Sequence, residues 1–309
     1  MTTRAPDEAK LIVNAALTGM VPSKADNPAT PVTPDEIAAD ARRVTDVGAS
    51  VVHLHARDEV GVPTWRPDVY REIVHRVREC CEDVVVCVST SGRTFKAFDE
   101  RAAVLELDGD ETPELASLTL GSLNFPQQTS VNEPEMIRRL VDRMYERGIT
   151  PELEVFDLGM TDYLGYLVER EIVRPPYYVN VLLGSLGTLS ASAFNLAAVV
   201  RALPPDATWS AAGIGRYQVD VNTLALAMGG HVRVGLEDNL WLDRRRTVPA
   251  DNASLVRRVV EIASALERPA ATPDEARRII GLPSPATRAS GEALDDAVVA
   301  PAEAPAAGR

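Results

Sequence analysis

The sequence has few cysteines, few aromatic residues and no long hydrophobic segment. Its three cysteines are Cys80, Cys81 and Cys87, a spacing that forms neither a disulfide framework nor a CxxC metal knuckle. We expect Cys87, inside the apolar run VVVCVST, to be buried as a small hydrophobic residue. The longest apolar runs fall far short of the ~20 residues that a membrane-spanning helix needs. No apolar region with a cleavage site follows the N-terminus, so we predict a cytoplasmic protein that binds no membrane.

Lysine is also scarce, with 3 residues against 29 arginines, and the formal net charge is −13. Nucleic acids and anionic membranes require clustered basic side chains, so we exclude both as main partners. The hydrophobic fraction of 45% is high enough to build a core, which excludes a disordered chain.

Short apolar segments alternate with amphipathic segments about eight times along the chain. Most of the apolar segments are uniformly hydrophobic, which is typical of parallel strands covered on both faces. The predicted strands are Leu11–Leu17, Val51–Ala56, Val84–Thr90, Leu115–Leu120, Glu152–Phe156, Tyr178–Leu183, Thr208–Ala212 and His231–Leu236.

Helix signals lie between these strands. Thr33 precedes Pro34 and two acidic residues, which predicts a capped helix that stops at Gly48. Similar signals predict helices over Glu133–Arg147, Ser190–Leu203, Tyr217–Met228, Asn252–Leu266 and Thr272–Leu282.

Eight such units favour a single (β/α)₈ TIM barrel with a C-terminal helical extension, an α/β fold. A doubly wound sheet is the alternative, but it usually carries a glycine-rich turn after its first strand, and here Thr18–Gly19–Met20 follows instead. We predict one catalytic barrel domain over residues 1–283 and an Ala/Pro-rich, unstructured tail over residues 284–309.

The four histidines are informative because they are so few. His53 and His55 lie two apart at the carboxyl end of the second strand, so they share a face at a spacing of about 7 Å. Two imidazoles at the active end of a barrel can bind zinc or a similar divalent ion. The alternative is that both rings simply pack in the barrel. We expect His231 to lie too deep to bind a metal and His75 to lie on a helix surface.

Glu237 and Asp238 follow the last strand, which in a closed barrel lies beside the first strand and close to the second. Glu237 can therefore complete a metal site with two histidines and an open position. A solvated loop or a helix cap is the alternative for this acidic pair. Arg233 is expected inside the barrel, where Asp238 and Glu154 are candidate partners. Its role stays open between a structural ion pair and an anchor for a substrate carboxylate.

Hydroxyl groups follow the third and fourth strands. Ser89, Thr90, Ser91 and Gly92 form one turn, and Ser117 and Thr119 alternate on the fourth strand. Such groups can bind a carboxylate or an oxyanion, or they can cap the following helices.

Several of these motifs occur together in one known family. The chain resembles the β-keto acid cleavage enzymes, whose founding activity is 3-keto-5-aminohexanoate cleavage. The resemblance covers about residues 11–282, and its order and spacing make it specific. It is carried by LIVNAALTG, GASVVHLHARDEVGVPT, STSG, ELASLTLGSLNF, PELEVFDLGM, GIGRYQ, GGHVRVGLEDN and ATPDEARRIIGL.

The resemblance implies a divalent-metal (β/α)₈ barrel, usually with zinc and usually a homotetramer. It also implies transfer of the acyl part of a β-keto acid to the CoA of acetyl-CoA, which releases acetoacetate. The implied metal ligands are His53, His55 and Glu237, and the implied base is Asp238, oriented by Arg233, Ser89 and Glu154. The implied contacts of the substrate carboxylate are the Ser89–Gly92 turn, with Thr90 and Ser91, and Ser117. Thr119 is a further candidate for substrate binding from its position on the fourth strand.

The chain departs from the family pattern at two positions. Val21 stands where members with an amino-bearing substrate place a glutamate, and valine cannot pair with an ammonium group. We therefore expect a substrate whose distal part is apolar, neutral or anionic. Ser91 replaces a common glycine, which affects substrate contacts. Arg93 could bind an anionic group of the substrate, but we expect it to be an exposed arginine at the start of a helix.

Two other functions remain open. A zinc-dependent hydrolase of the amidohydrolase type also uses HxH, but on its first strand and with further histidines on later strands. A non-catalytic protein that binds a metal or acyl-CoA is the other alternative. Substitution of Asp238 separates an enzyme from a binding protein.

Overall fold

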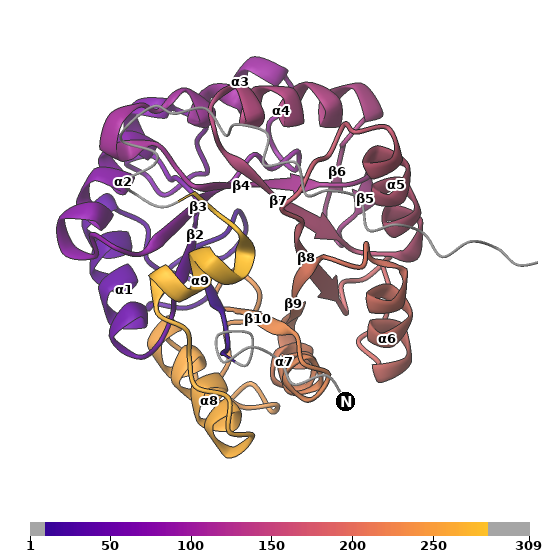
Figure 1. Ribbon diagram of the computed structural model, residues 1–309. Helices are drawn as coiled ribbons and strands as arrows, with labels where there is room; N and C mark the ends of the chain where they lie inside the picture. The colour runs from indigo at the N-terminus through magenta and orange to yellow at the C-terminus, as the bar shows by residue number, and fades with distance from the viewer. Residues whose placement is uncertain (1–9, 284–309) are drawn as a thin grey trace, which may run out of the picture.

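The strands of the protein close into a barrel that is surrounded by helices (Figure 1), as the computed structural model shows for residues 10–283. The predicted tail over residues 284–309 lies outside the described residues. The barrel strands are β1 (Val13–Ala16), β2 (Val51–Leu54), β3 (Val85–Val88), β4 (Leu115–Thr119), β7 (Thr150–Val155), β8 (Tyr178–Leu183), β9 (Thr208–Gly213) and β10 (His231–Val234).

The strand order is β1-β10-β9-β8-β7-β4-β3-β2, and every neighbouring pair is parallel. The predicted barrel fold and its eight strands are confirmed. As predicted, β10 lies beside β1, and β2 lies on the other side of β1. Several strands end earlier than predicted, for example β2 at Leu54 rather than Ala56 and β10 at Val234 rather than Leu236. His55 and Glu237 therefore lie just beyond the last ladder residues, where the chain turns over the barrel mouth.

The caps predicted at Thr33 and Thr272 are confirmed, whereas Glu133, at the start of another predicted helix, makes no side-chain cap bond. Thr33, Asp251 and Thr272 each accept a hydrogen bond from the third residue of the helix that follows, and each forms a capping box. The predicted helix Ser190–Leu203 begins later, because Ser192 is its cap. The helices are α1 (Pro34–Asp46), α2 (Pro67–Cys80), α3 (Phe98–Ala102), α4 (Pro134–Glu146), α5 (Leu158–Glu169), α6 (Ala193–Ala202), α7 (Gln218–Ala227), α8 (Asn252–Ala265) and α9 (Pro273–Ile280).

Some short elements have no predicted counterpart. They include an antiparallel hairpin after β4, made of β5 (Leu123–Asn124) and β6 (Thr129–Ser130). They also include three single-turn 3₁₀ helices, Ala103–Glu106, Gly109–Glu111 and Gly215–Tyr217. Two-residue strands and single turns leave no periodic pattern in a sequence. Among the described residues, no helix combines the length and hydropathy needed to cross a bilayer.

Helix α9 closes the end of the barrel where the strands begin (Figure 1). Ala276 and Ile280 of α9 pack against Ile12, Val51 and other buried residues at the strand starts. Buried Arg277 of the same helix donates through Nε to Glu114 Oε1 at 2.7 Å. The opposite end, at the carboxyl ends of the strands, is therefore the open face of the barrel.

The ion pair between α9 and the barrel yields a stability prediction. Replacing Arg277→Ala leaves the buried carboxylate of Glu114 without its closest partner, and the free energy of unfolding should fall by about 3 kcal/mol. Denaturant unfolding followed by circular dichroism measures the change. The control is Arg257→Ala on the exposed side of α8, which should change stability by less than about 0.5 kcal/mol. Equal effects of the two substitutions would contradict this account of the barrel closure.

Candidate active site

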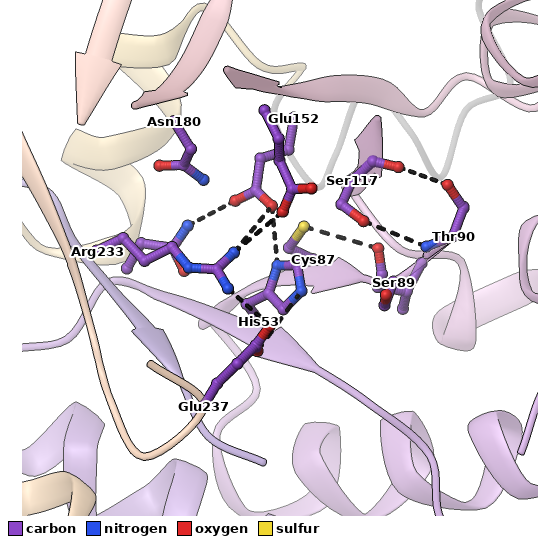
Figure 2. Close-up of polar contacts among 12 residues, drawn as sticks. His53, Cys87, Ser89, Thr90, Ser117, Glu152, Asn180, Arg233 and Glu237 are labelled. Carbon is purple, nitrogen blue, oxygen red and sulfur yellow. Dashed lines mark hydrogen bonds and ion pairs between the residues drawn. The ribbon is translucent and has the colours of Figure 1, made fainter. Parts of the chain in front are cut away.

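Two imidazoles and a carboxylate meet at the open face of the barrel. Figure 2 shows the side chains of two of these residues, His53 and Glu237, close to each other. His53 Nε2 lies 3.3 Å from His55 Nε2, and His55 Nε2 lies 3.2 Å from Glu237 Oε1. Both histidines are buried, and the Glu237 side chain is 16% exposed. The structure therefore brings together the three metal-type side chains predicted from the sequence.

Two glycines allow the chain to place Glu237 here. Gly235 has φ of +156°, and a β-carbon on it would come within 2.1 Å of the Ala16 carbonyl oxygen. Only glycine lets the segment after β10 pass so close to β1. Gly19, with φ of +70°, lies against the Glu237 side chain, where a β-carbon would come within 2.6 Å of Cγ. These contacts fix the carboxylate over the two imidazoles.

The donor set fits a divalent metal ion. The buried Glu237 Oε2 has no hydrogen-bond partner among the described residues. The facing ring nitrogens of His53 and His55 need a proton or a cation between them, since two lone pairs repel. Two imidazoles and one carboxylate are typical of zinc sites that keep an open coordination position. A second group, His53, Cys87 and Glu152, is also close enough to hold an ion, but all three side chains are fully buried and leave no access for a ligand.

A single buried guanidinium links the acidic side chains of the site. Arg233 Nη2 lies 2.7 Å from Glu237 Oε1, and its Nε lies 3.1 Å from Asp238 Oδ2. Its Nη1 lies 3.3 Å from Glu154 Oε1 and 4.0 Å from Glu152 Oε2. Both partners predicted for Arg233 are present. Four carboxyl groups share one guanidinium, so the pocket has an excess of negative charge that a divalent cation would offset.

The site carboxyl groups differ in their pKa. Burial would raise the pKa of Glu237, but Arg233 and the two imidazoles hold it well below its ordinary value. Burial raises the pKa of Asp238 despite Arg233, and the neighbouring Glu237 charge adds to the rise. Burial likewise raises the pKa of Glu154, again against Arg233. Glu237 is therefore a permanent anion suited to a metal, whereas Asp238 holds a proton more readily and suits proton transfer.

The sequence analysis assigned no role to Glu152, whose fully buried carboxylate contacts His53. Its Oε2 lies 2.8 Å from His53 Nδ1, and its Oε1 accepts from Asn14 Nδ2 at 2.6 Å. Burial would raise the pKa of Glu152, but His53 and Arg233 lower it to about 2. An anionic Glu152 keeps the proton of His53 on Nδ1 and leaves Nε2 free to bind a metal. The signal was available, because Glu152 and Glu154 share a strand face just as His53 and His55 do.

The predicted hydroxyl turn lies at the end of β3. Ser89 Oγ accepts from Ser91 N at 3.2 Å, and Ser91 Oγ accepts from Arg93 N at 3.3 Å. Ser89 therefore bonds within the turn, and no hydrogen bond to Asp238, Arg233 or Glu154 is found among the described contacts. Gly92 is closely packed, since a β-carbon there would come within 2.4 Å of the Val131 carbonyl oxygen.

The hydroxyls of the two threonines are already engaged. Thr90 Oγ1 donates to the Ser117 carbonyl at 2.6 Å, while Ser117 Oγ accepts from Thr90 N at 3.2 Å. Thr119 Oγ1 donates to Glu154 Oε2 at 2.6 Å. These bonds fix β3, β4 and β7 relative to one another at the open face.

A small pocket lies beside the hydroxyl turn. Its lining includes Ser89, Thr90 and Ser91 and the larger side chains of Met20 and Phe95. Val21 follows Met20 in the β1–α1 loop and is 51% exposed.

The structure also places the remaining residues that the sequence analysis discussed, two histidines, a cysteine and an arginine. His231 Nδ1 accepts from Ile12 N at 3.0 Å near the strand starts, and His75 is on the exposed face of α2 next to Glu111, as predicted. Cys87 is buried as predicted. The expectation for Arg93 was wrong: it lies half-buried in the turn after β3, and the next helix begins only at Phe98. Its guanidinium stacks on the Phe125 ring, a contact that no local pattern predicts.

The family model described as beta-keto acid cleavage enzyme matches residues 10–282. The chain belongs to this family. The resemblance noted from the sequence and the prediction of a β-keto acid cleavage enzyme are thereby confirmed.

Curated relatives of the β-keto acid cleavage enzyme family match over 88% of the chain. It is 40% identical to the 3-keto-5-aminohexanoate cleavage enzyme of Fusobacterium nucleatum over 274 residues, or 98% of that protein. It is 36% identical to the 3-oxoadipate:acetyl-CoA acetyltransferase of Cupriavidus necator over 276 residues, or 95% of that protein. Among solved structures, the apo structure of ObcA shares the fold with a TM-score of 0.72 and 24% identity, over 82% of this chain and 66% of that chain.

The contact between Glu152 and His53 yields a prediction about metal affinity. Glu152→Gln places an amide where the carboxylate accepts the Nδ1 proton, so the proton of His53 moves to Nε2 and blocks metal binding there. Affinity for zinc should fall about 10- to 100-fold in a competition titration with a chromophoric chelator. Glu261→Gln, on the exposed side of α8, is the control and should keep the parent affinity. An unchanged affinity in the Glu152 variant would show that this carboxylate does not set the histidine tautomer.

Proposed function

We propose that the protein transfers the acyl part of a β-keto acid to the CoA of acetyl-CoA, which yields a new acyl-CoA and acetoacetate. The bond between the keto carbon and the methylene carbon breaks, and the acetyl group of acetyl-CoA takes the place of the departing acyl group. Family membership and the acetyl-CoA named for the Cupriavidus relative support this reaction. The observation that carries it is the pairing of a two-histidine, one-carboxylate donor set with a separate carboxyl group, Asp238, in the same charged network.

Under this proposal, His53 Nε2, His55 Nε2 and Glu237 hold a divalent ion, for which zinc is the first candidate. When bound, such an ion acts as a Lewis acid toward the keto and carboxylate oxygens of the substrate. Glu152 orients His53 for this role through Nδ1. Arg233 holds Glu237 in place from the barrel side.

Asp238 is the proposed base that removes a proton from the methylene carbon of the keto acid. Burial raises the pKa of Asp238, which makes the carboxylate a stronger base than an exposed aspartate. Arg233 contacts both of its oxygens, with Nε 3.1 Å from Oδ2 and Nη2 3.5 Å from Oδ1. This contact orients the carboxylate and opposes the rise of its pKa. Arg233 Nη1 donates to Glu154, which helps to position the guanidinium. Thr119 donates to the other oxygen of Glu154 and orients that carboxylate.

The hydroxyls of Ser89 and Ser91 are the proposed donors to the substrate carboxylate. Each accepts a backbone N–H within the turn, so its own proton is available for a substrate oxygen. Thr90 and Thr119 have already donated their protons, so we assign them to positioning rather than to direct contact. Ser117 and Gly92 shape the same turn.

The names of the relatives include both an amino-bearing and a dicarboxylic substrate. Val21 carries no charge with which to pair an ammonium group, so we propose a substrate without a distal amine.

The single-domain organisation over residues 1–283, the cytoplasmic location and the homotetramer stay predictions from the sequence.

The direct test is an assay of acetoacetate formation from acetyl-CoA and a panel of β-keto acids. The parent protein loaded with zinc should form acetoacetate and a new acyl-CoA in equal amounts, and Asp238→Asn should lower kcat/KM about 10²- to 10⁴-fold, because the proposed base is lost. The zinc content of Asp238→Asn should stay at the parent level, since Asp238 is not a proposed ligand.

Asp162→Asn on the exposed side of α5 is the matched control and should keep full activity. Absence of acetoacetate with every keto acid would contradict the reaction. Full activity in Asp238→Asn would contradict the assignment of the base, and loss of zinc from that variant would show that Asp238 belongs to the metal site.

A further inference from the structure

A second arginine, Arg93, lies near the mouth of the barrel, and its guanidinium has an aromatic partner but no polar partner among the described residues. Arg93 belongs to the turn after β3, two residues beyond Ser91, whose hydroxyl accepts its backbone N–H. Its guanidinium lies 3.4 Å from the centroid of the Phe125 ring. Phe125 in turn packs edge-on against Phe156, with ring centroids 5.9 Å apart, at the end of β7. The stacked rings hold the guanidinium between the hydroxyl turn and the β5–β6 hairpin.

The guanidinium of Arg93 makes no hydrogen bond or ion pair with any residue that the structure describes, although the residue is half-buried. The buried arginines of the protein differ from it. Arg57 and Arg101 donate to backbone carbonyls, and Arg233 contacts carboxylates. This guanidinium has lost part of its hydration, and its contact with an aromatic ring offsets only part of that desolvation cost. Such a group is suited to an anion that arrives with the substrate.

Arg93 also interacts electrostatically with the charged groups of the candidate active site. Burial lowers the pKa of Arg93, while the carboxylates of Glu237, Glu154 and Asp238 act in the opposite direction. Those three carboxylates would be engaged by the metal ion and by Arg233 under the proposed function. Among the described residues near the hydroxyl turn, Lys96 already donates to the carbonyls of Gly92 and Arg93, whereas the Arg93 guanidinium has no polar partner.

We propose that Arg93 binds a second carboxylate, at the end of the β-keto acid far from the keto group, and that the preferred substrates are 3-oxo diacids. The inference rests on the proposed function and narrows its substrate class. The first carboxylate is placed at the Ser89 and Ser91 hydroxyls, and Arg93 follows directly in the same turn. Val21 in the β1–α1 loop is uncharged, so no carboxylate at this position repels a dianionic substrate.

Two keto acids of equal length give the sharpest test, 3-oxohexanedioate and 3-oxohexanoate, because they differ only in the terminal carboxylate. The parent protein should have a kcat/KM at least about 10-fold higher for the diacid. Arg93→Gln should lower kcat/KM for the diacid about 10- to 100-fold, mainly through KM, and should change the value for the monoacid by less than about 3-fold. Arg93→Lys keeps the charge but loses the forked donor geometry, so its kcat/KM for the diacid should lie between those of the parent protein and of Arg93→Gln.

Arg139→Gln is the matched control, since Arg139 also stacks on an aromatic ring, Phe98, at 3.9 Å, but on the exposed side of α4. It should leave both substrates unaffected. An equal loss for diacid and monoacid in Arg93→Gln would overturn the inference, and so would a rise confined to the KM of acetyl-CoA, which would place a CoA phosphate at Arg93. A parent protein that prefers the monoacid or 5-amino-3-oxohexanoate overturns it even if no variant folds. Absence of acetoacetate from all three keto acids would instead refute the proposed function itself.

Discussion

The candidate site depends on how the barrel interior neutralises a group of buried carboxylates. Arg233 is almost fully buried and lies within 4.0 Å of Glu152, Glu154, Glu237 and Asp238. One guanidinium cannot balance four carboxylates, so the network either takes up protons or gains another cation. The raised pKa of Asp238 and Glu154 reflects the first response, and the donor set of His53, His55 and Glu237 provides for the second.

The closed barrel is what makes this network possible. Arg233 comes from β10, Glu152 and Glu154 come from β7, and His53 comes from β2, so the charges converge across the barrel interior. Closure of β10 on β1 and the glycine at position 235 bring Glu237 over the histidines. Helix α9 covers the other end of the barrel, which leaves the carboxyl ends of the strands as the face open to ligands. The same charges that would hold a metal destabilise the barrel without one, so we expect metal binding to contribute to folding stability.

The sequence predicted the strands, the barrel and the three convergent metal-type side chains, because each depends on a local period or on strand order alone. His53 and His55 share a strand face by spacing, and closure of a parallel barrel places Glu237 beside them. The spacing of Glu152 and Glu154 indicates that they share a strand face, but the contact of Glu152 with His53 crosses the barrel from β7 to β2 and depends on strand register, which the spacing does not give. Arg93 was misplaced because its position depends on Phe125, which comes from a hairpin too short to predict. The acceptors of the Thr90 and Thr119 hydroxyl groups likewise follow from contacts between strands.

The central claim is that the excess negative charge of the barrel mouth holds a divalent ion between His53, His55 and Glu237. Anomalous diffraction from crystals of the zinc-loaded protein, recorded on both sides of the zinc absorption edge, tests it most directly. We predict a single strong peak about 2.0 to 2.2 Å from His53 Nε2, His55 Nε2 and a Glu237 carboxylate oxygen. A peak among His53, Cys87 and Glu152, or no peak at full zinc loading, would contradict the account.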